Sequence, residues 1–437
     1  MKTVIVIGGG AAGMMAAIGA AREGASVTLL EKNEKLGKKI YITGKGRCNL
    51  TNACDLQEFS EHVVTNRRFL LSALHGFDNT ATMEFFEELG MPVKTERGKR
   101  VFPVSDKASD VIRALERECR RLGVRVRLHT EVKGLRTEAL PAEDTSAETA
   151  ENAQKPKKQK KPQATCAVTG VRLSDGTELA ADAVVLATGG LSYPTTGSTG
   201  DGYRMAGKLG HDVTRLVPSL VSLTARESCC AELAGLTLKN VSVKFNDKTG
   251  KLLREDFGEL LFTHRGISGP VVLTATAFCA DALVGGTAVI DTKPALTEEQ
   301  LQARLLRELE GGKSKQMKNL IGVLVPAALG EEMLKRSGID SAKTAGSVTR
   351  EERLRLAGEL RHFSLTIDGM GGYNEAVVTK GGVSVSEVNP STMESRIAKG
   401  LYLAGEVLDV DATTGGFNLQ IAWSTGMLAG RRAARDE

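Results

Sequence analysis

The residues with the clearest chemistry stand in the segment 1–31. Gly8, Gly10 and Gly13 follow an apolar stretch and open a run of small residues, and Glu31 closes a second apolar stretch. In this arrangement the first glycine permits a tight turn, the second lets the backbone approach a pyrophosphate, and the third lets helix and strand pack closely. A carboxylate in the position of Glu31 accepts the hydroxyl groups of a ribose. The segment therefore predicts a strand–helix–strand unit that binds a dinucleotide, either FAD or NAD.

A second glycine-rich segment lies at 400–434. A short apolar stretch precedes Gly405 and Glu406, and a glycine-rich turn then opens an amphipathic helix at about Phe417. The positive end of a helix dipole here favours a negatively charged ligand, such as the N1–C2=O edge of a reduced flavin. A nucleotide motif at one end of the chain and this arrangement at the other are together typical of FAD domains and uncommon in NAD dehydrogenases.

Positioning both segments requires that the chain leave one sheet and return to it. Helical periodicity covers 57–90 and 106–122, and alternation predicts a strand at 123–132. The segment 166–190 predicts a hairpin around Asp175-Gly176, then a buried strand that ends at Thr188-Gly189. Ligands bind beyond the carboxyl ends of such strands. We expect a doubly wound α/β domain formed by 1–194 and 363–437.

The middle of the chain has a different pattern. Short alternating strands occupy 237–263 and 286–292, and the charged segment 297–361 is helical. The helical segment places Leu301, Leu305, Leu306 and Leu309 on one face. We therefore expect an inserted substrate domain at 195–362, with a β part at about 195–295 and a helical part at about 296–362.

Composition limits the class of protein. The chain has 437 residues, of which 41% are hydrophobic and 25% charged, as in soluble globular proteins. It contains no apolar run of the roughly 18–20 residues that span a bilayer, so membrane insertion is not expected. The expected location is the cytoplasm. Seven cysteines without a CxxC pair suit a reducing compartment and predict no metal site.

The net charge of +5 does not by itself indicate a polyanionic partner. The low-complexity insertion 138–163 holds five acids and then five lysines, which cancel, and we expect it to be a disordered loop. Elsewhere basic residues are interspersed with acids, and no basic stripe with aromatic residues is present. A small-molecule substrate is expected, without nucleic acid or membrane, and the oligomeric state is not predicted.

Five motifs carry a resemblance to a known family. They are KLGKKIYITGKGRCNLTN (35–52), LFTHRGISGP (261–270), VTKGGV (378–383), TMES (392–395) and AGEVLDVDATTGGFNLQIA (404–422). They resemble the signatures of the bacterial YhiN/BaiN-like flavoproteins over nearly the whole chain. The resemblance implies a glutathione-reductase-like, Rossmann-type FAD domain with an inserted β-barrel and helical domain. It also implies reduction of the Δ4 and Δ6 double bonds of 3-oxo bile-acid intermediates.

The same resemblance assigns FAD-binding residues by position. They are Gly8, Gly10, Ala12, Gly13, Glu31, Lys32, Lys39, Gly44, Arg47, Cys48, Val132, Thr188, Gly189, Gly405, Glu406, Asp411, Gly416, Phe417, Asn418 and Leu419. The first four, Gly8, Gly10, Ala12 and Gly13, would contact the pyrophosphate. Glu31 would contact the adenosine ribose, and the backbone of Val132 would contact the adenine.

Reduction of an activated C=C bond requires a hydride, a group that polarises the carbonyl and a proton donor. The expected catalytic residues are Arg47, Cys48, His264 and Arg265, with Tyr193 as a further candidate. For Arg47 a second role is equally open, in which the side chain only holds FAD or the surrounding loop and takes no part in catalysis. A redox disulfide between Cys48 and Cys54 is disfavoured, because the spacing is one residue longer than the CxxxxC of disulfide reductases.

Three functions are therefore compared. The first is an FAD-dependent reductase of a conjugated enone, such as a 3-oxo-Δ4 or Δ6 bile acid or steroid. NAD(P)H is the expected electron donor, although no second nucleotide motif is present to bind it. The second is an FAD-dependent oxidase of a small amine or aminoketone, which needs no NADH. The third, an RNA-associated flavoprotein, is disfavoured by the dispersed charge.

Overall fold

The structure is a computed structural model that describes residues 1–141 and 164–435. The chain forms two compact units. Unit 1 contains 1–217 and 377–437, and unit 2 contains 218–376. The expected boundaries at 194/195 and 362/363 therefore shift by more than ten residues each. Helix α7 (Asp201–Lys208) packs against unit 1, and strand β17 (Phe363–Met370) closes the barrel of unit 2.

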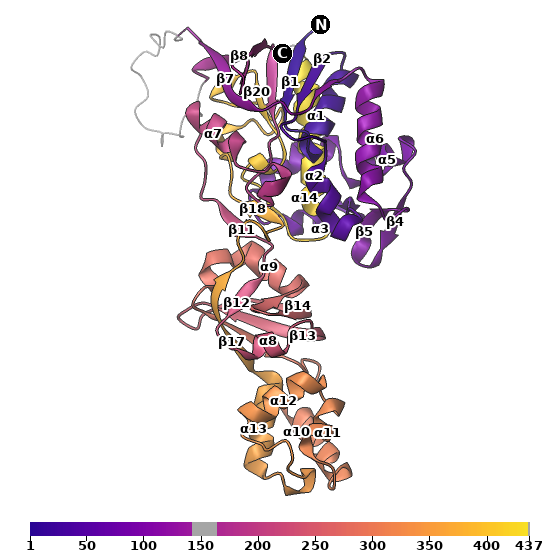
Figure 1. The fold of residues 1–437 in the computed structure, drawn as a ribbon, viewed down its shortest axis with the longest axis vertical. Coiled ribbons are helices and arrows are strands. Elements are labelled where there is room, and N and C mark those ends of the chain that lie inside the picture. The colour runs from indigo at the N-terminus through magenta and orange to yellow at the C-terminus, as the bar shows by residue number, and fades with distance from the viewer. Residues whose placement is uncertain (142–163, 436–437) are drawn as a thin grey trace, which may run out of the picture. The chain divides into compact units, whose positions relative to one another are not determined.

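Unit 1 is built on a five-stranded sheet in the order β20-β10-β1-β2-β6, and all its strand pairs are parallel (Figure 1). Its strands are β1 (Thr3–Ile7), β2 (Ser26–Leu30), β6 (Arg125–Arg127), β10 (Ala183–Leu186) and β20 (Leu401–Leu403). The central strands β1 and β10 are almost wholly buried, as expected for parallel strands covered on both faces. The predicted Rossmann-type fold is confirmed.

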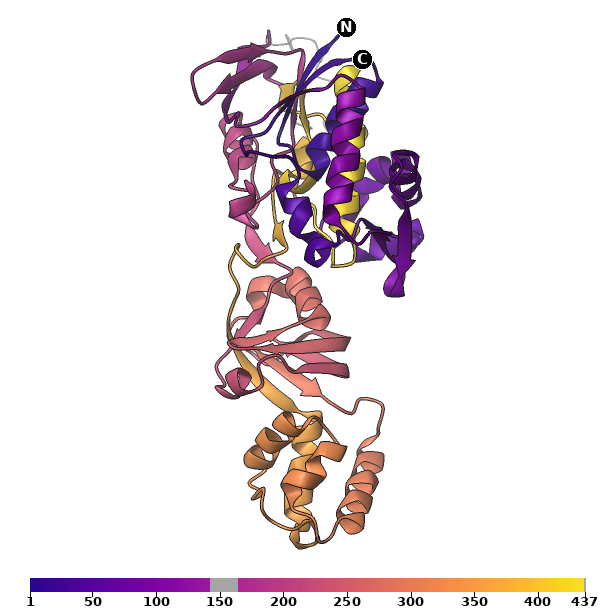
Figure 2. The same ribbon diagram turned by 45° about the vertical axis from the view of Figure 1, so that its right-hand side comes forward.

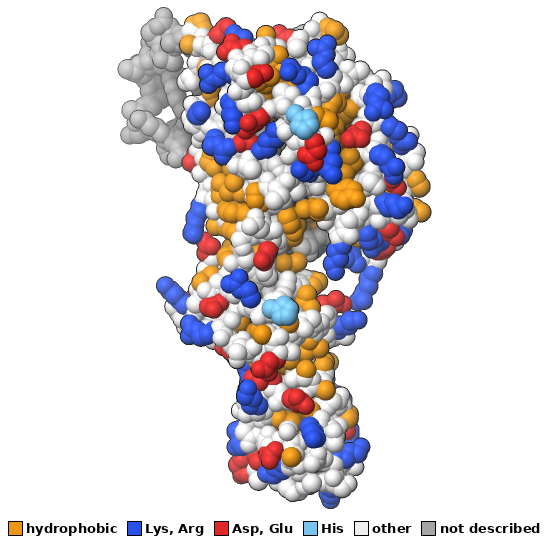
Figure 3. All heavy atoms as spheres, viewed as in Figure 1, with side chains coloured by type: hydrophobic (Ala, Val, Ile, Leu, Met, Phe, Trp, Pro, Cys, Tyr) orange, Lys and Arg blue, Asp and Glu red, His pale blue; other side chains and the backbone are white. Residues whose placement is uncertain are grey.

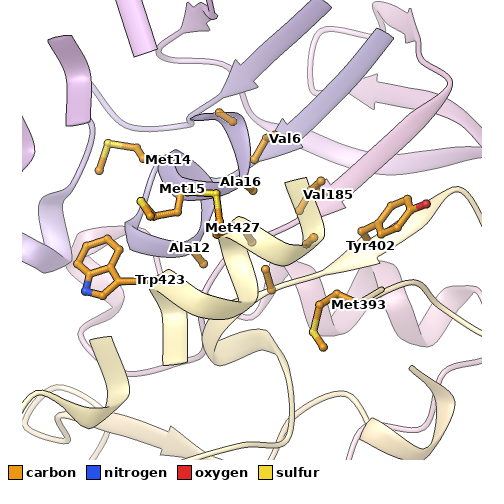
Figure 4. Packing of buried hydrophobic residues seen from close by; sticks show 14 of the residues in the cluster. Val6, Ala12, Met14, Met15, Ala16, Val185, Met393, Tyr402, Trp423 and Met427 are labelled. Atoms are coloured by element: carbon orange, nitrogen blue, oxygen red, sulfur yellow. The ribbon is translucent and has the colours of Figure 1, made fainter. Parts of the chain in front are cut away.

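Two long helices lie against each other on this sheet, α1 (Ala11–Arg22) and α14 (Phe417–Ala434). They approach so closely that a Cβ on Gly430 would stand 2.0 Å from the backbone oxygen of Ala16. Figure 4 shows Met15 of α1 beside Met427 and Trp423 of α14. This packing fixes the two nucleotide-motif segments, far apart in sequence, on one framework.

Smaller elements surround the sheet. A three-stranded antiparallel sheet consists of β3 (Thr51–Asn52), β5 (Arg100–Pro103) and β4 (Val93–Glu96), and a second sheet consists of β19 (Ala398–Lys399), β8 (Cys166–Leu173), β7 (Val132–Ala139) and β9 (Glu178–Ala180). The helices are α2 (Lys38–Ile42), α3 (Leu56–His62), α4 (Leu71–Gly76), α5 (Asn79–Glu88) and α6 (Ala108–Arg121). Glu138 and Ala139 end β7, and the remainder of the expected disordered insertion, from 142 to 163, lies outside the described residues.

Unit 2 contains a closed six-stranded barrel in the order β12-β15-β14-β13-β16-β17. Besides β17, its strands are β12 (Leu223–Ala225), β13 (Thr237–Asn246), β14 (Leu252–Thr263), β15 (Gly266–Ser268) and β16 (Thr287–Asp291). Inward positions such as Val243, Phe245 and Phe262 are buried, and their neighbours along the strands face outward. The predicted barrel is confirmed.

The helices of unit 2 are α8 (Cys229–Glu232), α9 (Pro270–Cys279), α10 (Glu298–Gly311), α11 (Met317–Leu320), α12 (Ala327–Arg336) and α13 (Arg350–Arg361). Figures 1 and 2 show α10 to α13 gathered at one end of this unit, where they share a hydrophobic core with the barrel. Leu301, Leu305 and Leu309 are buried in that core. Leu306 is 42% exposed, so its predicted place on the buried face is wrong.

The two remaining strands are β11 (Val217–Ser219) and β18 (Val378–Lys380), which form a two-stranded sheet. Within the part of the chain that the structure describes, no helix has the length and apolar character needed to cross a membrane.

Candidate functional site

The turn between β1 and α1 has the geometry that its glycines predict. Gly8 has φ +103°, and a Cβ there would lie 2.5 Å from the backbone oxygen of Ala187. A Cβ on Gly13 would come within 1.8 Å of the Gly8 oxygen. No atom lies within 4 Å of the corresponding position on Gly10. The turn is therefore tightly packed behind Gly8 and Gly13 and open in front of Gly10, as a pyrophosphate requires.

Glu31 stands immediately after β2 and is only 8% exposed. Its Oε2 accepts a hydrogen bond from the Gly9 amide at 2.7 Å, and its Oε1 accepts from the backbone N–H and side-chain amide of Asn33 at 2.8 and 2.7 Å. A carboxylate has about four acceptor positions, so capacity remains for a ribose hydroxyl. These bonds also fix the glycine turn against the end of β2.

A hydrogen-bonded chain connects several loops around the carboxyl ends of the strands. Lys39 Nζ lies 2.7 Å from Glu406 Oε2, and the Thr379 amide donates to Glu406 Oε1 at 2.8 Å. Thr379 Oγ1 accepts from the amides of Leu191 and Ser192 at 2.8 and 3.1 Å. Sequence reasoning placed Lys39 and Glu406 at the site but missed Thr379, whose only signal was its position in the motif VTKGGV.

The loop after β10 contains a buried polar atom without a partner. Thr188 Oγ1 makes no hydrogen bond with any described residue, and the next residue, Gly189, has φ +71°. Lys32 reaches across to this region, where its Nζ lies 2.6 Å from Thr199 Oγ1 and 2.5 Å from Asp201 Oδ2. Val132 is buried at the start of β7.

The N-terminus of α14 is held by close backbone packing. Gly416 has φ +99°, and a Cβ there would lie 2.4 Å from the Thr51 oxygen. The Asn418 side chain accepts from the Ala412 amide at 2.9 Å and donates to its carbonyl at 2.8 Å, which closes the preceding loop. Gly405, Ala12 and Leu419 also belong to this region. Gly405 has φ +73° and packs on Ala12, and Leu419 is half-buried on the first turn of α14.

His62 is a residue of this region that sequence reasoning missed. Its ring stacks on Phe417 with centroids 4.1 Å apart, and its Nδ1 lies 2.8 Å from Thr413 Oγ1. Burial lowers the pKa of His62, so the imidazole is neutral at pH 7. Nothing in the sequence marks this histidine, because the contact joins residues about 350 positions apart.

Asp411 is the most deeply buried acid of the site, at 1% exposure. Neither of its carboxylate oxygens accepts a hydrogen bond from a described residue within ordinary geometry, and Lys380 Nζ lies 3.7 Å from Oδ2. Burial raises the pKa of Asp411. An acid in this environment is stabilised by a ligand that brings hydroxyl donors.

Arg47 and Cys48 end the loop that follows α2. The Arg47 guanidinium pairs with Glu96 and Asp106, each at 2.5 Å, and lies 4.2 Å from the ring centre of Phe102. Cys48 has φ +59° and is fully buried, and burial raises the pKa of its thiol to about 12. In the same loop Gly44 has φ +57°, and a Cβ there would lie 2.8 Å from the Asn49 amide.

Cys54 is a free buried thiol, as is Cys48, and burial raises the pKa of Cys54 to about 11. Tyr193 is half-buried at φ +53° in the loop after β10. His264 and Arg265 belong to unit 2, where both are exposed in the tight turn between β14 and β15. No group of three or more potential metal ligands occurs among residues 1–141 and 164–435.

Unit 1 thus presents an open glycine turn, an acid beside it, a Thr188 hydroxyl without a hydrogen-bond partner among the described residues, and an Asp411 carboxyl that accepts no hydrogen bond from them. These features fit a ligand that carries both phosphates and many hydroxyl groups, and FAD is such a ligand. The family comparison agrees with this chemistry. The model of the HI0933-like protein Rossmann domain matches residues 2–432.

The chain belongs to this HI0933-like family.

Two relatives match it over nearly their full lengths. A 3-dehydro-bile acid delta(4,6)-reductase of Clostridium scindens is 36% identical over 99% of both chains. A ribosomal RNA dihydrouridine synthase of Haemophilus influenzae is 30% identical over 96% of both. The resemblance drawn from the sequence motifs is thereby confirmed, and the chain is an FAD-dependent oxidoreductase.

Among solved structures, a 3-ketosteroid-delta4-(5alpha)-dehydrogenase of Rhodococcus jostii matches with a TM-score of 0.52 and 18% identity. The match covers 100% of this chain and 97% of that one. At this identity it supports the shared fold alone.

Proposed function

We propose that this HI0933-like protein reduces a C=C bond conjugated with a carbonyl group, and that its substrate is a 3-oxo-Δ4 or Δ6 steroid such as a bile-acid intermediate. The fit of the unit 1 loops to FAD carries the proposal. It is supported by the bile-acid reductase relative, which is 36% identical to this chain. When bound, FAD supplies the hydride for the β-carbon of the enone.

The residues of the chain have separate tasks in this proposal. Gly8, Gly10 and Gly13 let the backbone approach the pyrophosphate, and Glu31 receives the ribose hydroxyls. The chain of hydrogen bonds through Glu406 fixes the segments after β2, β10 and β20 relative to one another. The first turn of α14 contributes unpaired backbone N–H groups that favour negative charge on the ring.

The catalytic residues of the proposal are Cys48, His264 and Arg265, and Arg47 is a positioning residue. Burial raises the pKa of the Cys48 thiol to about 12, so the thiol stays protonated at neutral pH, and in the proposal it donates its proton to the α-carbon. We assign Arg47 a positioning role, since Glu96, Asp106 and Phe102 already occupy its guanidinium. His264 and Arg265 are exposed and therefore available to a ligand.

An anaerobic titration tests the proposal. The purified protein is followed at ~450 nm while NADH or NADPH is added, and then a 3-oxo-4-ene bile acid. We expect loss of the flavin absorbance with a nicotinamide donor and its recovery on addition of the enone. Loss of absorbance on addition of an amine without any nicotinamide, followed by recovery with oxygen but not with the enone, would favour the oxidase instead. If neither NADH nor NADPH lowers the flavin absorbance, the proposal that NAD(P)H is the electron donor is wrong.

A second candidate is the reduction of uridine in ribosomal RNA. Dihydrouridine arises by reduction of the C5=C6 bond of uracil, which is also conjugated with a carbonyl, so the flavin chemistry is the same. The specific observation in its favour is the charge of residues 91–127, which contain eleven Lys and Arg but five Asp and Glu. Dihydrouridine in RNA incubated with the reduced protein, detected by mass spectrometry of nucleosides, distinguishes it from steroid reduction.

A further inference from the structure

The positive charge of the chain is concentrated in unit 1. Residues 91–127 carry a larger excess of basic over acidic residues than the whole chain, whose net charge is +5. In the fold this segment forms β4, β5, α6 and β6. Figure 3 shows Lys and Arg side chains gathered over α6 and the β4–β5 hairpin, along the right-hand edge of this unit. The dispersed charge inferred from the sequence is therefore a local surface.

A groove lies within this surface. It has a volume of about 720 Å³ and is lined by the α6 residues Arg113, Arg117 and Arg120 and, on the facing loops, by Met91 and Val104. The three arginines are spaced four and three residues apart, so they form one ridge along the helix. All three are exposed. We name this feature the α6 groove.

The acids of α6 do not cancel the ridge. Glu118 is buried on the opposite side of the helix, where it pairs with Arg22 and Arg121. Asp110 pairs with Arg113, and Glu116 is the other acid that lines the groove. Arg117 donates to the Leu89 carbonyl and forms no ion pair with a residue of 1–141 or 164–435.

Arg120 has no ion pair with any residue in the described part of the chain. Beyond the groove, the exposed residues Arg97, Arg100 and Lys107 extend the positive surface along the hairpin and into the loop before α6. Successive cations along a groove match the repeating phosphates of a nucleic acid backbone.

We propose that the α6 groove binds the phosphate backbone of RNA. The inference rests on the second candidate function, and it adds the surface by which the RNA is held. The groove offers arginines and an aliphatic wall but no aromatic side chain on which a base could stack. Its contacts therefore hold and orient the RNA without reading its sequence, and recognition of the target base falls to the flavin site.

The test is RNA binding by the full-length protein with FAD. A fluorescein-labelled, uridine-rich RNA 20-mer is titrated at several KCl concentrations and followed by anisotropy. The groove variant combines Arg113→Gln, Arg117→Gln and Arg120→Gln. The matched control combines Arg307→Gln, Lys313→Gln and Lys318→Gln, which remove the same charge from exposed positions of unit 2.

We expect the groove variant to bind about tenfold more weakly and its salt slope to fall by about 2, since each lost phosphate contact removes roughly 0.7. The control is expected to stay within about twofold of the parent. An equal loss in both variants, or binding by the parent that does not depend on salt, overturns the proposal. Weaker binding of inorganic polyphosphate by the groove variant with unchanged binding of RNA also overturns it, because the groove would then bind anions other than RNA.

Flavin absorbance and reduction of the 3-oxo-4-ene bile acid are measured on all three proteins. Both readouts are expected to be unchanged, because the arginines lie on the exposed side of α6. Steroid reduction without groove-dependent RNA binding overturns the groove and leaves the first proposed function standing. Groove-dependent RNA binding without reduction of steroid or uridine overturns the functions and leaves the groove standing.

Discussion

At the scale of single residues, a buried acid that accepts no hydrogen bond lowers the stability of the folded protein, and a ligand that donates to it removes this cost. Because the folded-state pKa of Asp411 is raised above the ordinary 3.8, the folded protein holds this proton more tightly than the unfolded chain. The stability of the FAD-free protein is therefore greatest below pH ~4 with respect to this group, and it falls as pH rises toward the folded-state pKa. We predict that Asp411→Asn stabilises the FAD-free protein at pH 7 and weakens its binding of FAD.

Urea unfolding from pH 4 to 8 and a titration with FAD check this prediction. Asp175→Asn is the control, for which the opposite change in stability is expected at pH 7. Hydrogen bonds from Thr177 lower the pKa of Asp175, so its substitution removes stability at neutral pH. An Asp411→Asn protein that is less stable than the parent at pH 7 would mean that the carboxylate has partners in the FAD-free state.

Gly416 gives a second prediction at this scale. Gly416→Ala is strained by the left-handed backbone, at about 1–2 kcal/mol, and also by the contact of a Cβ with the Thr51 oxygen at 2.4 Å. Gly46→Ala shares the positive φ, but no atom lies within 4 Å of its Cβ position. We expect Gly416→Ala to lose more stability in urea and most of its bound FAD, and Gly46→Ala to keep FAD. Equal effects would mean that backbone strain alone matters.

At the scale of elements, helix α10 shows what a periodic pattern does and does not determine. Leu305 and Leu306 are adjacent and chemically identical, but they are 1% and 42% exposed. Leu305→Ala is expected to lower the free energy of unfolding by about 2–5 kcal/mol, because it leaves a cavity in the core of unit 2. Leu306→Ala is expected to change it by less than about 0.5 kcal/mol. Chemical denaturation of the two variants measures the difference directly.

The same contrast explains which elements could be predicted. The glycine turn, the Asp175-Gly176 hairpin and the start of α14 at Phe417 depend on local backbone needs, and each is found where the sequence placed it. The helical segment 57–90 instead breaks into three short helices. Asp106 stands just before α6 and pairs with Arg47 and Lys94, which periodicity does not predict.

Contacts between distant segments could not be predicted in this way. Thr379 accepts hydrogen bonds from amides almost 190 positions away, and the ring stacking of His62 on Phe417 joins residues about 350 positions apart. The positive surface of α6 arises because the fold buries Glu118 and leaves Arg113, Arg117 and Arg120 exposed. Sequence periodicity predicts which residues share a face of one helix or strand. The geometry of the site depends instead on which elements the sheet brings together.

At the scale of the whole molecule, each unit has its own hydrophobic core, and every proposed FAD-binding residue belongs to unit 1. The two ends of the unit 1 chain at the insertion are close together. Val213 bridges to Val383, and both residues belong to unit 1. Removal of unit 2 should therefore leave a gap that a short linker can close.

We predict that a protein in which Gly-Ser-Gly-Ser replaces residues 218–376 folds cooperatively and binds FAD, but does not reduce the enone. The reason is that the FAD loops and the core beneath them are complete without unit 2, whereas the expected substrate domain is missing. Flavin absorbance per chain, thermal unfolding and the anaerobic enone assay test the three parts separately. Loss of FAD in a cooperatively folded protein would assign part of the cofactor site to unit 2. Retained enone reduction would place substrate binding in unit 1 and remove His264 and Arg265 from the catalytic residues.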